Sequence, residues 1–286
     1  MENTSRIRAQ EQNGSIDDEP TGLALLALLE RRSSADWDAP AVGYRGMDAA
    51  DQALAERSVR WMIGNVPGFQ RVENPSSYPS GSALMALSVF LATGGPDNVG
   101  ANVTVNQAIA NGVNSFKRTQ GNRGFNQGGW NYRSAESDGD LSTTQFAAAG
   151  LGAAVSIFDD ADDTLNRMTG FLDNTKTGDG GHRYRGGGRN GASGAMSASG
   201  IWCYRLAGRD VSDGQVQSGM RWLRDNYDYE RQSNWWQNSY YYYLWAAAKG
   251  LEVSHRPDGA EGDGNIYAED IGGARDPILD GFEDEP

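Results

Sequence analysis

The sequence predicts an all-α fold of paired helices, from three observations on the 286-residue chain. Five segments are apolar and rich in Ala, Gly and Ser, and four amphipathic segments separate them. Turns with glycine pairs stand before two of the apolar segments. No strand-like alternation of apolar and polar residues competes over a comparable length. Because an apolar helix needs cover on both sides and an amphipathic helix on only one, we expect concentric rings with the apolar helices inside.

The five predicted inner helices each follow a turn and are built from small apolar residues. They begin near Pro20, Tyr78, Asp140, Asn190 and Gln237. Successive starts are separated by roughly 46 to 63 residues, a spacing that is typical of a helix-pair repeat. Asp140 is also a candidate N-cap, a role worth about 1 kcal/mol to a helix.

The four predicted outer helices cover residues 49–65, 104–120, 161–175 and 212–227. In the last of them Val216, Met220 and Leu223 recur at helical spacing. The other positions of these helices are charged or amidic, so one face of each should meet water.

Composition and charge restrict the partners. Eight Trp and 12 Tyr are too many for a disordered chain. A net charge of −13 argues against nucleic acid, which requires a basic face on the protein. The apolar runs at 22–29 and 146–158 do not read as a secretory signal or a transmembrane segment. We therefore expect a soluble, cytoplasmic protein.

Several motifs resemble the α/α-toroid of squalene–hopene cyclases and protein prenyltransferases. They are Gln120 followed by Gly128-Gly129-Trp130, Gly180-Gly181 with Tyr184-Arg185, STTQFAAAGL at 142–151 and SASGIWCYRLAG at 197–208. The resemblance implies an α/α-toroid over residues 20–252, between an N-terminal segment at 1–19 and an acidic tail at 253–286. Five inner and four outer helices make an open or small ring. Either the tail closes the gap, or a further N-terminal repeat segment of a longer product completes the ring.

The resemblance also indicates where a cyclase would hold its acid. Class II terpenoid cyclases protonate an alkene with the middle Asp of a D-x-D-D-T-A motif, which opens an inner helix. The corresponding stretch here is 140–144, in which Ser142 stands at the donor position and Thr143 beside it. A hydroxyl of neutral pKa cannot protonate an alkene, so we expect no cyclase acid at this place.

A literal match to the acidic motif occurs at 160–164, where a predicted inner helix ends and an outer helix begins. Under the alternative of an active class II terpenoid cyclase, Asp162 is the catalytic acid, with Asp160 and Asp163 beside it. The competing interpretation is a solvated acidic cluster, because carboxylates at a helix start are favoured by capping and by the helix dipole.

The main functional hypothesis is a cyclase-like protein without its proton donor, which binds an apolar or amphipathic, isoprenoid-like molecule, or a partner, in a central cavity. The polar start of the third inner helix, including Gln145, offers hydroxyls and an amide to such a ligand. The candidate ligand-binding residues are Trp130, Tyr132, Asp138, Asp140, Ser142, Thr143, His182, Tyr184, Trp236, Tyr240 and Tyr243.

Two competing interpretations apply to that set. The aromatic residues also suit packing between helices, and His182 suits a turn. Asp138 and Asp140 could instead be the paired carboxylates of a carbohydrate-active toroid.

We expect no cofactor and no metal. Protein prenyltransferases hold zinc with Asp, Cys and His, but Cys203 and His182 lack convergent ligands at a suitable spacing. Cys203 lies in an apolar helical run, where a buried, inert thiol is expected.

Overall fold

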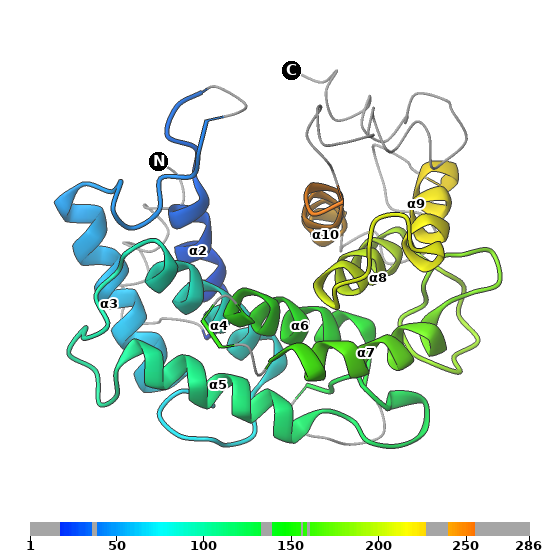
Figure 1. Cartoon of the computed structure of the whole chain (residues 1–286), viewed down its shortest axis with the longest axis horizontal. Helices are drawn as coiled ribbons and strands as arrows, with labels where there is room; N and C mark the ends of the chain where they lie inside the picture. The colour runs from blue at the N-terminus through cyan, green and yellow to red at the C-terminus, as the bar shows by residue number, and fades with distance from the viewer. Residues whose placement is uncertain are drawn as a thin grey trace. The chain divides into compact units, whose positions relative to one another are not determined.

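The computed structural model describes residues 18–35, 39–132, 139–155, 157–158, 161–226 and 240–254. Within these ranges the regular structure is helical, and the only β-type pairings are two isolated bridges, Arg32 with Ala41 and Lys176 with His182. The predicted all-α class is therefore confirmed for the described part of the chain (Figure 1).

Each predicted helix has a counterpart whose ends differ from the prediction by a few residues at most. The helices are α2 (Asp18–Glu30), α3 (Ala49–Asn65), α4 (Ser77–Ala92), α5 (Val105–Thr119), α6 (Leu141–Val155), α7 (Asp162–Thr175), α8 (Gly194–Leu206), α9 (Gly214–Asn226) and α10 (Tyr240–Glu252), with a 3₁₀ turn η1 (Gly124–Asn126). The even-numbered helices are the apolar set. For example, α8 buries 11 of its 13 residues, whereas α9 buries 6 of 13 and turns its other side to water.

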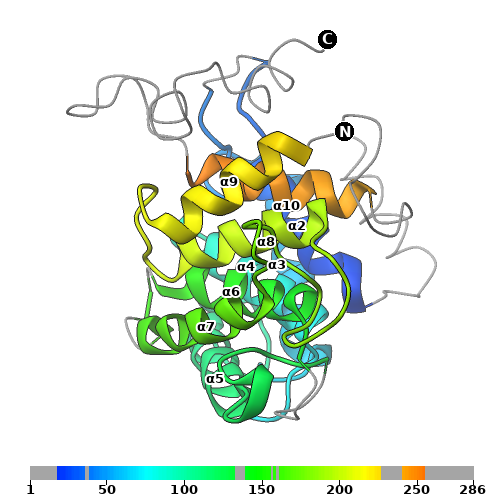
Figure 2. The same cartoon turned by 90° about the vertical axis from the view of Figure 1, so that its right-hand side faces the viewer.

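Backbone contacts divide the chain into two compact units. Unit 1 comprises Met1–Gln120, Trp130–Glu136 and Phe146–Leu165, and unit 2 comprises Gly121–Gly129, Ser137–Gln145 and Asn166–Pro286. In unit 1, α4 packs against α2, α3 and α5. In unit 2, α8 lies beside both α9 and α10, as the two views in Figures 1 and 2 show.

Glycine lets the apolar helices approach one another closely. A Cβ atom on Gly22 of α2 would lie 2.6 Å from the carbonyl carbon of Ser82 in α4. A Cβ atom on Gly250 of α10 would lie 3.2 Å from the carbonyl oxygen of Ala198 in α8. Small residues in these helices are thus a packing requirement, because a larger side chain would force the two backbones apart.

Candidate functional site

The turn before Trp130 rests directly on the outer helix that follows it. Gly128 has a φ of +95°, and a Cβ atom there would lie 2.2 Å from the carbonyl oxygen of Arg167 in α7. A Cβ atom on Gly129 would lie 2.7 Å from the Phe171 ring of the same helix. Both glycines are therefore required, the first by backbone conformation and close approach and the second by the aromatic ring beneath it.

The turn before His182 repeats this arrangement on the next outer helix. Gly180 has a φ of +100°, and its Cβ atom would lie 2.7 Å from the carbonyl oxygen of Ser218 in α9. A Cβ atom on Gly181 would lie 2.6 Å from the Trp222 ring. Contacts that repeat at two places in the chain are expected of a structural connection between repeats, whereas a catalytic site is needed only once. We call the turn at 128–130 the first joint and the turn at 180–182 the second joint.

The residue after each glycine pair is buried and contacts the outer helix that precedes the turn. Trp130 is 1% exposed, and its indole Nε1 donates a hydrogen bond to the carbonyl oxygen of Phe116 in α5 at 2.9 Å. His182 is fully buried, with its Nδ1 3.0 Å from Oγ1 of Thr175 at the end of α7. Both are joint residues by position, as the turn interpretation of His182 expects.

The imidazole of His182 is uncharged at neutral pH. Burial, assisted by the positive charge of Lys176, lowers its pKa from the ordinary 6.5 to about 3. Thr175 Oγ1 donates to the carbonyl oxygen of Leu172, so it accepts from His182 Nδ1–H. Nε2 then carries a lone pair, for which the described residues provide no hydrogen-bond partner.

Each joint also holds the first residue of an apolar helix. The carbonyl oxygen of Tyr132 accepts a hydrogen bond from the amide of Ser77, where α4 begins, at 2.9 Å. The carbonyl oxygen of Tyr184 accepts one from the amide of Leu141, where α6 begins, also at 2.9 Å. Because the first amides of a helix have no partner inside the helix, these contacts satisfy donors that would otherwise be orphaned.

Four of the predicted site residues meet at the start of α6. Asp140 is fully buried, and its Oδ1 accepts hydrogen bonds from Ser142 Oγ at 2.5 Å and from the Thr143 amide at 2.9 Å. Its Oδ2 accepts a hydrogen bond from the Tyr184 hydroxyl at 2.7 Å. Asp140 is thus the N-cap that the sequence predicts, and three donors hold it in the role of acceptor. An acid that protonates an alkene needs the opposite arrangement, with its own proton turned to the substrate.

A second buried polar cluster joins the apolar helices α6, α8 and α10. We call it the Gln145 cluster: Gln145, Ser199 and Tyr242. The Oε1 atom of Gln145 accepts hydrogen bonds from the Ser199 and Tyr242 hydroxyls. Gln145 and Ser199 are fully buried, while Tyr242 is partly exposed. The amide nitrogen of Gln145 is buried and has no hydrogen-bond partner among the described residues.

Sequence reasoning found only one member of this cluster. A glutamine in an alanine-rich helix is a visible signal, and Gln145 was expected to offer its amide. Ser199 and Tyr242 carry no local signal, because one lies among small residues and the other within a run of four tyrosines. Their role depends on which helices pack together.

The predicted aromatic residues are engaged in packing where they are described. Tyr243 is 2% exposed, and its ring lies 3.0 Å from the Cβ position of Gly194 at the start of α8. Tyr240 contacts it, with ring centroids 6.3 Å apart. Tyr132 is 44% exposed and meets the Tyr78 ring edge-on at 5.5 Å. The contact of Tyr243 with α8 is packing between helices, whereas Tyr240 and Tyr243 contact each other within α10.

The acidic motif at 160–164 is described except for its first residue, Asp160. Asp162 and Asp163 are exposed in the first turn of α7. Their position suits the helix dipole, and exposure to water does not suit an acid strong enough to protonate an alkene. Three candidates, Asp138, Asp160 and Trp236, lie outside the described residues.

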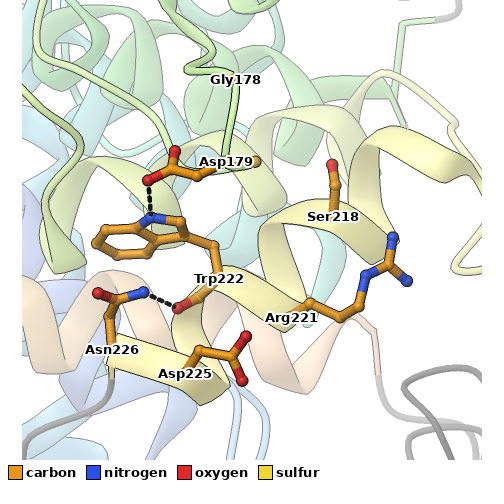
Figure 3. Close-up of a pocket in the computed structure, with 8 residues that line it drawn as sticks. Gly178, Asp179, Ser218, Arg221, Trp222, Asp225 and Asn226 are labelled. Atoms are coloured by element: carbon orange, nitrogen blue, oxygen red, sulfur yellow. Dashed lines mark hydrogen bonds between the residues drawn. The ribbon is translucent and has the colours of Figure 1, made fainter.

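A pocket of about 320 Å³ lies against the second joint (Figure 3). The Trp222 indole Nε1 donates to Asp179 Oδ2 at 3.1 Å, and Asn226 Nδ2 donates to the Trp222 carbonyl oxygen at 2.9 Å. Hydrogen bonds from Thr177, then Trp222, lower the pKa of the Asp179 carboxyl against the effect of burial. The residues lining the pocket are Gly178, Asp179, Gly180, Ser218, Arg221, Trp222, Asp225 and Asn226.

The charges of this pocket are not part of the joint geometry. At the first joint, the residue before the glycine pair is Gln127, and the α7 positions that correspond to Arg221 and Asp225 are Gly170 and Asn174. That joint makes the same close contacts without a charged group at any of the three positions. None of these pocket residues was predicted to form a site, because the polar face of an outer helix looks the same in sequence whether or not a pocket lies on it.

The described residues form neither a metal site nor an exposed thiol. No three His, Cys, Asp or Glu side chains there are arranged to hold a metal ion. Cys203 is fully buried, and burial raises the pKa of its thiol well above the ordinary value. None of the described helices has the length and apolar character that crossing a membrane requires.

No protein-family model matches the chain, and no curated protein matches it in sequence. The resemblance to the cyclase toroids therefore stays a prediction from the motifs.

Proposed function

We propose that this chain is a cyclase-like α/α-toroid repeat protein that binds an apolar or amphipathic small molecule of isoprenoid type, without the proton donor of a class II cyclase. Two features of the described residues support the repeat: apolar and amphipathic helices alternate along the chain, and the same glycine joint occurs twice. Binding without cyclisation is supported by Asp140, whose two oxygens already accept three hydrogen bonds.

The observation that carries the proposal is the Gln145 cluster. A buried polar group without a partner costs about 1–3 kcal/mol, and native proteins contain few of them. The amide nitrogen of Gln145 is such a group, although its Oε1 atom is fully used. A ligand that brings an oxygen acceptor would remove this cost, and the surrounding apolar helices would receive its hydrocarbon part.

If the oxygen and nitrogen of the Gln145 side-chain amide exchange places, one polar atom of Gln145 is still left without a partner. Ser199 Oγ has a single proton, and it also lies 2.8 Å from the carbonyl oxygen of Ala195. If Ser199 donates there, the Gln145 nitrogen faces the two hydroxyls and its oxygen becomes the buried atom without a partner. In either orientation one polar atom of Gln145 is left for a ligand, and a hydroxyl on the ligand suits both orientations, since a hydroxyl both donates and accepts.

The test compares two probes that differ in one oxygen. We expect farnesol to bind more tightly than 2,6,10-trimethyldodeca-2,6,10-triene, the hydrocarbon with the same carbon skeleton and the same double bonds, by about tenfold, since one hydrogen bond contributes roughly 1–1.5 kcal/mol. Binding is measured by titration of the intrinsic tryptophan fluorescence. The Gln145→Leu variant should bind the two probes about equally.

The matched control is Gln217→Leu in α9. Gln217 is also buried and has one polar atom without a described partner, but it lies on an amphipathic helix. This variant should keep the preference for farnesol. If neither probe binds the unaltered protein, or if Gln145→Leu keeps the preference, the proposed function is wrong.

A further inference from the structure

Unit 2 carries an exposed basic and aromatic surface, which we call the arginine surface: Arg123, Phe125, Arg185, Gly187 and Arg189. All three arginines are exposed, and Phe125 is 63% exposed. None of the three arginines forms an ion pair with a carboxylate among the described residues. This is notable in a chain with 38 acidic and 25 basic residues.

The loop at 183–189 meets the 3₁₀ turn η1 at Gly187 and Phe125, and the three arginines flank this contact along the chain. Arg183 Nη1 donates to the carbonyl oxygen of Gly188 at 2.6 Å, which closes the loop. Gly187 has a φ of +67°, and a Cβ atom there would lie 2.9 Å from the Phe125 ring. The Phe125 ring therefore covers the backbone of Gly187, and Arg185 and Arg189 lie two positions before and after Gly187 in the sequence.

The combination indicates a partner that is acidic and carries apolar side chains. The guanidinium of Arg185 lies over the Tyr184 ring, 5.5 Å from its centroid, but none of the three arginines has a carboxylate partner among the described residues. Arginines favour carboxylates, with which they form two parallel hydrogen bonds. An exposed phenylalanine contributes free energy only when a partner covers it. An acidic polypeptide meets both conditions, whereas an inorganic anion would leave the ring in water.

We propose that the arginine surface binds the acidic segment 258–286 of the same chain. This segment has ten Asp or Glu and one Arg, and it includes Ile278, Leu279 and Phe282. It follows α10, which belongs to unit 2 as the arginine surface does. About 30 residues of extended chain reach roughly 100 Å, so the connection is long enough.

Tethering favours this segment over a separate acidic protein. A short linker gives a tethered segment an effective concentration on the order of millimolar. A separate acidic protein has no such advantage, and the net charge of −13 would repel it during approach.

The experiment follows the segment in the full chain with one dye. Cys203 is fully buried, so a thiol-reactive dye on a Gly281→Cys variant labels position 281 alone. We expect the fluorescence anisotropy of the dye to fall when Arg185→Ser and Arg189→Ser are combined in this protein. Sodium chloride at 1 M, where the Debye length is about 3 Å, should cause the same fall.

The matched control replaces two exposed arginines of unit 1. Arg71→Ser with Arg118→Ser changes the net charge by the same amount, and both control arginines have partners within unit 1, Glu73 and Asn74. The control should leave the anisotropy unchanged, and circular dichroism shows whether each protein is folded. The Phe125→Ser substitution alone should lower the anisotropy of the dye in part. If the anisotropy is equal in all these proteins, or if the control lowers it as much, the proposal is wrong.

Discussion

Replacing Trp130 with alanine tests whether the Gly-Gly-Trp stretch is a structural joint. The indole is 1% exposed, meets the Phe116 ring at a centroid distance of 6.3 Å and donates one hydrogen bond. Truncation to alanine removes about 200 Å² of buried apolar surface, worth roughly 5 kcal/mol at 25 cal/mol per Å². Partial collapse of the site reduces this, so we expect a loss of about 3–5 kcal/mol.

The assay is equilibrium unfolding in urea followed by circular dichroism, with a check that two probes give the same transition. Tyr132→Ala is the control, because this residue lies two positions along the same turn and is 44% exposed. It should cost about 1 kcal/mol or less. A Trp130→Ala variant that unfolds at the same urea concentration as the parent, yet no longer binds farnesol, would show that Trp130 serves binding and would refute the joint.

Four further predictions concern single residues. Gly128→Ala should lower the free energy of unfolding in urea by about 2 kcal/mol or more, because the φ of Gly128 is +95°. The control, Gly64→Ala on α3, places its Cβ atom in open space and should raise the free energy of unfolding by about 0.5–1 kcal/mol. Equal effects of the two substitutions would contradict the conformational requirement at Gly128. Asp140→Ala should cost roughly 3 kcal/mol, because two buried donors and one partly buried donor lose their acceptor, and a loss near 1 kcal/mol would mean that only a cap was removed. The pKa of His182 is about 3 in the folded protein and 6.5 in the unfolded chain, so its contribution to stability is complete above pH 6.5. That contribution falls by about 1.4 kcal/mol per pH unit between pH 6.5 and 3, because only the unfolded chain takes up the proton. In urea titrations at pH 7.5 and 4.5, the His182→Leu variant should therefore lose less stability on acidification than the parent. Asp162→Asn should cost no more than about 1 kcal/mol and leave the binding of farnesol unchanged, and loss of a cyclising activity with the fold intact would favour the cyclase alternative.

The helices could be predicted because their signals are local. Apolar periodicity places α3 at 49–65 to the residue, and the glycine pairs mark the joints because a positive φ at Gly128 and Gly180 excludes most other residues. The N-cap role of Asp140 follows from its position in the sequence, but the size of its contribution to stability does not. Tyr184, 44 residues away, supplies a third hydrogen bond and completes a buried cluster, so the cost of its removal exceeds that of an ordinary cap.

Gln145 could be selected from the sequence, but its partners Ser199 and Tyr242 could not be predicted, because the hydrogen bonds join residues that are 54 and 97 positions apart. The same limit applies to the arginine surface, where η1 and the loop after His182 meet only in the folded unit. Exposure separates residues that look alike in sequence: Tyr243 is 2% exposed and Tyr241 is 82% exposed, although both belong to one run of tyrosines.

The most direct test of the binding proposal is a crystal structure of the protein grown with farnesol. The account predicts that the farnesol oxygen lies within about 3.2 Å of the amide group of Gln145, at the polar atom that has no described partner in the unliganded protein. The hydrocarbon chain should lie along the apolar helices of unit 2. A protein atom or an ordered water at that amide atom, with farnesol bound elsewhere or not at all, would contradict it.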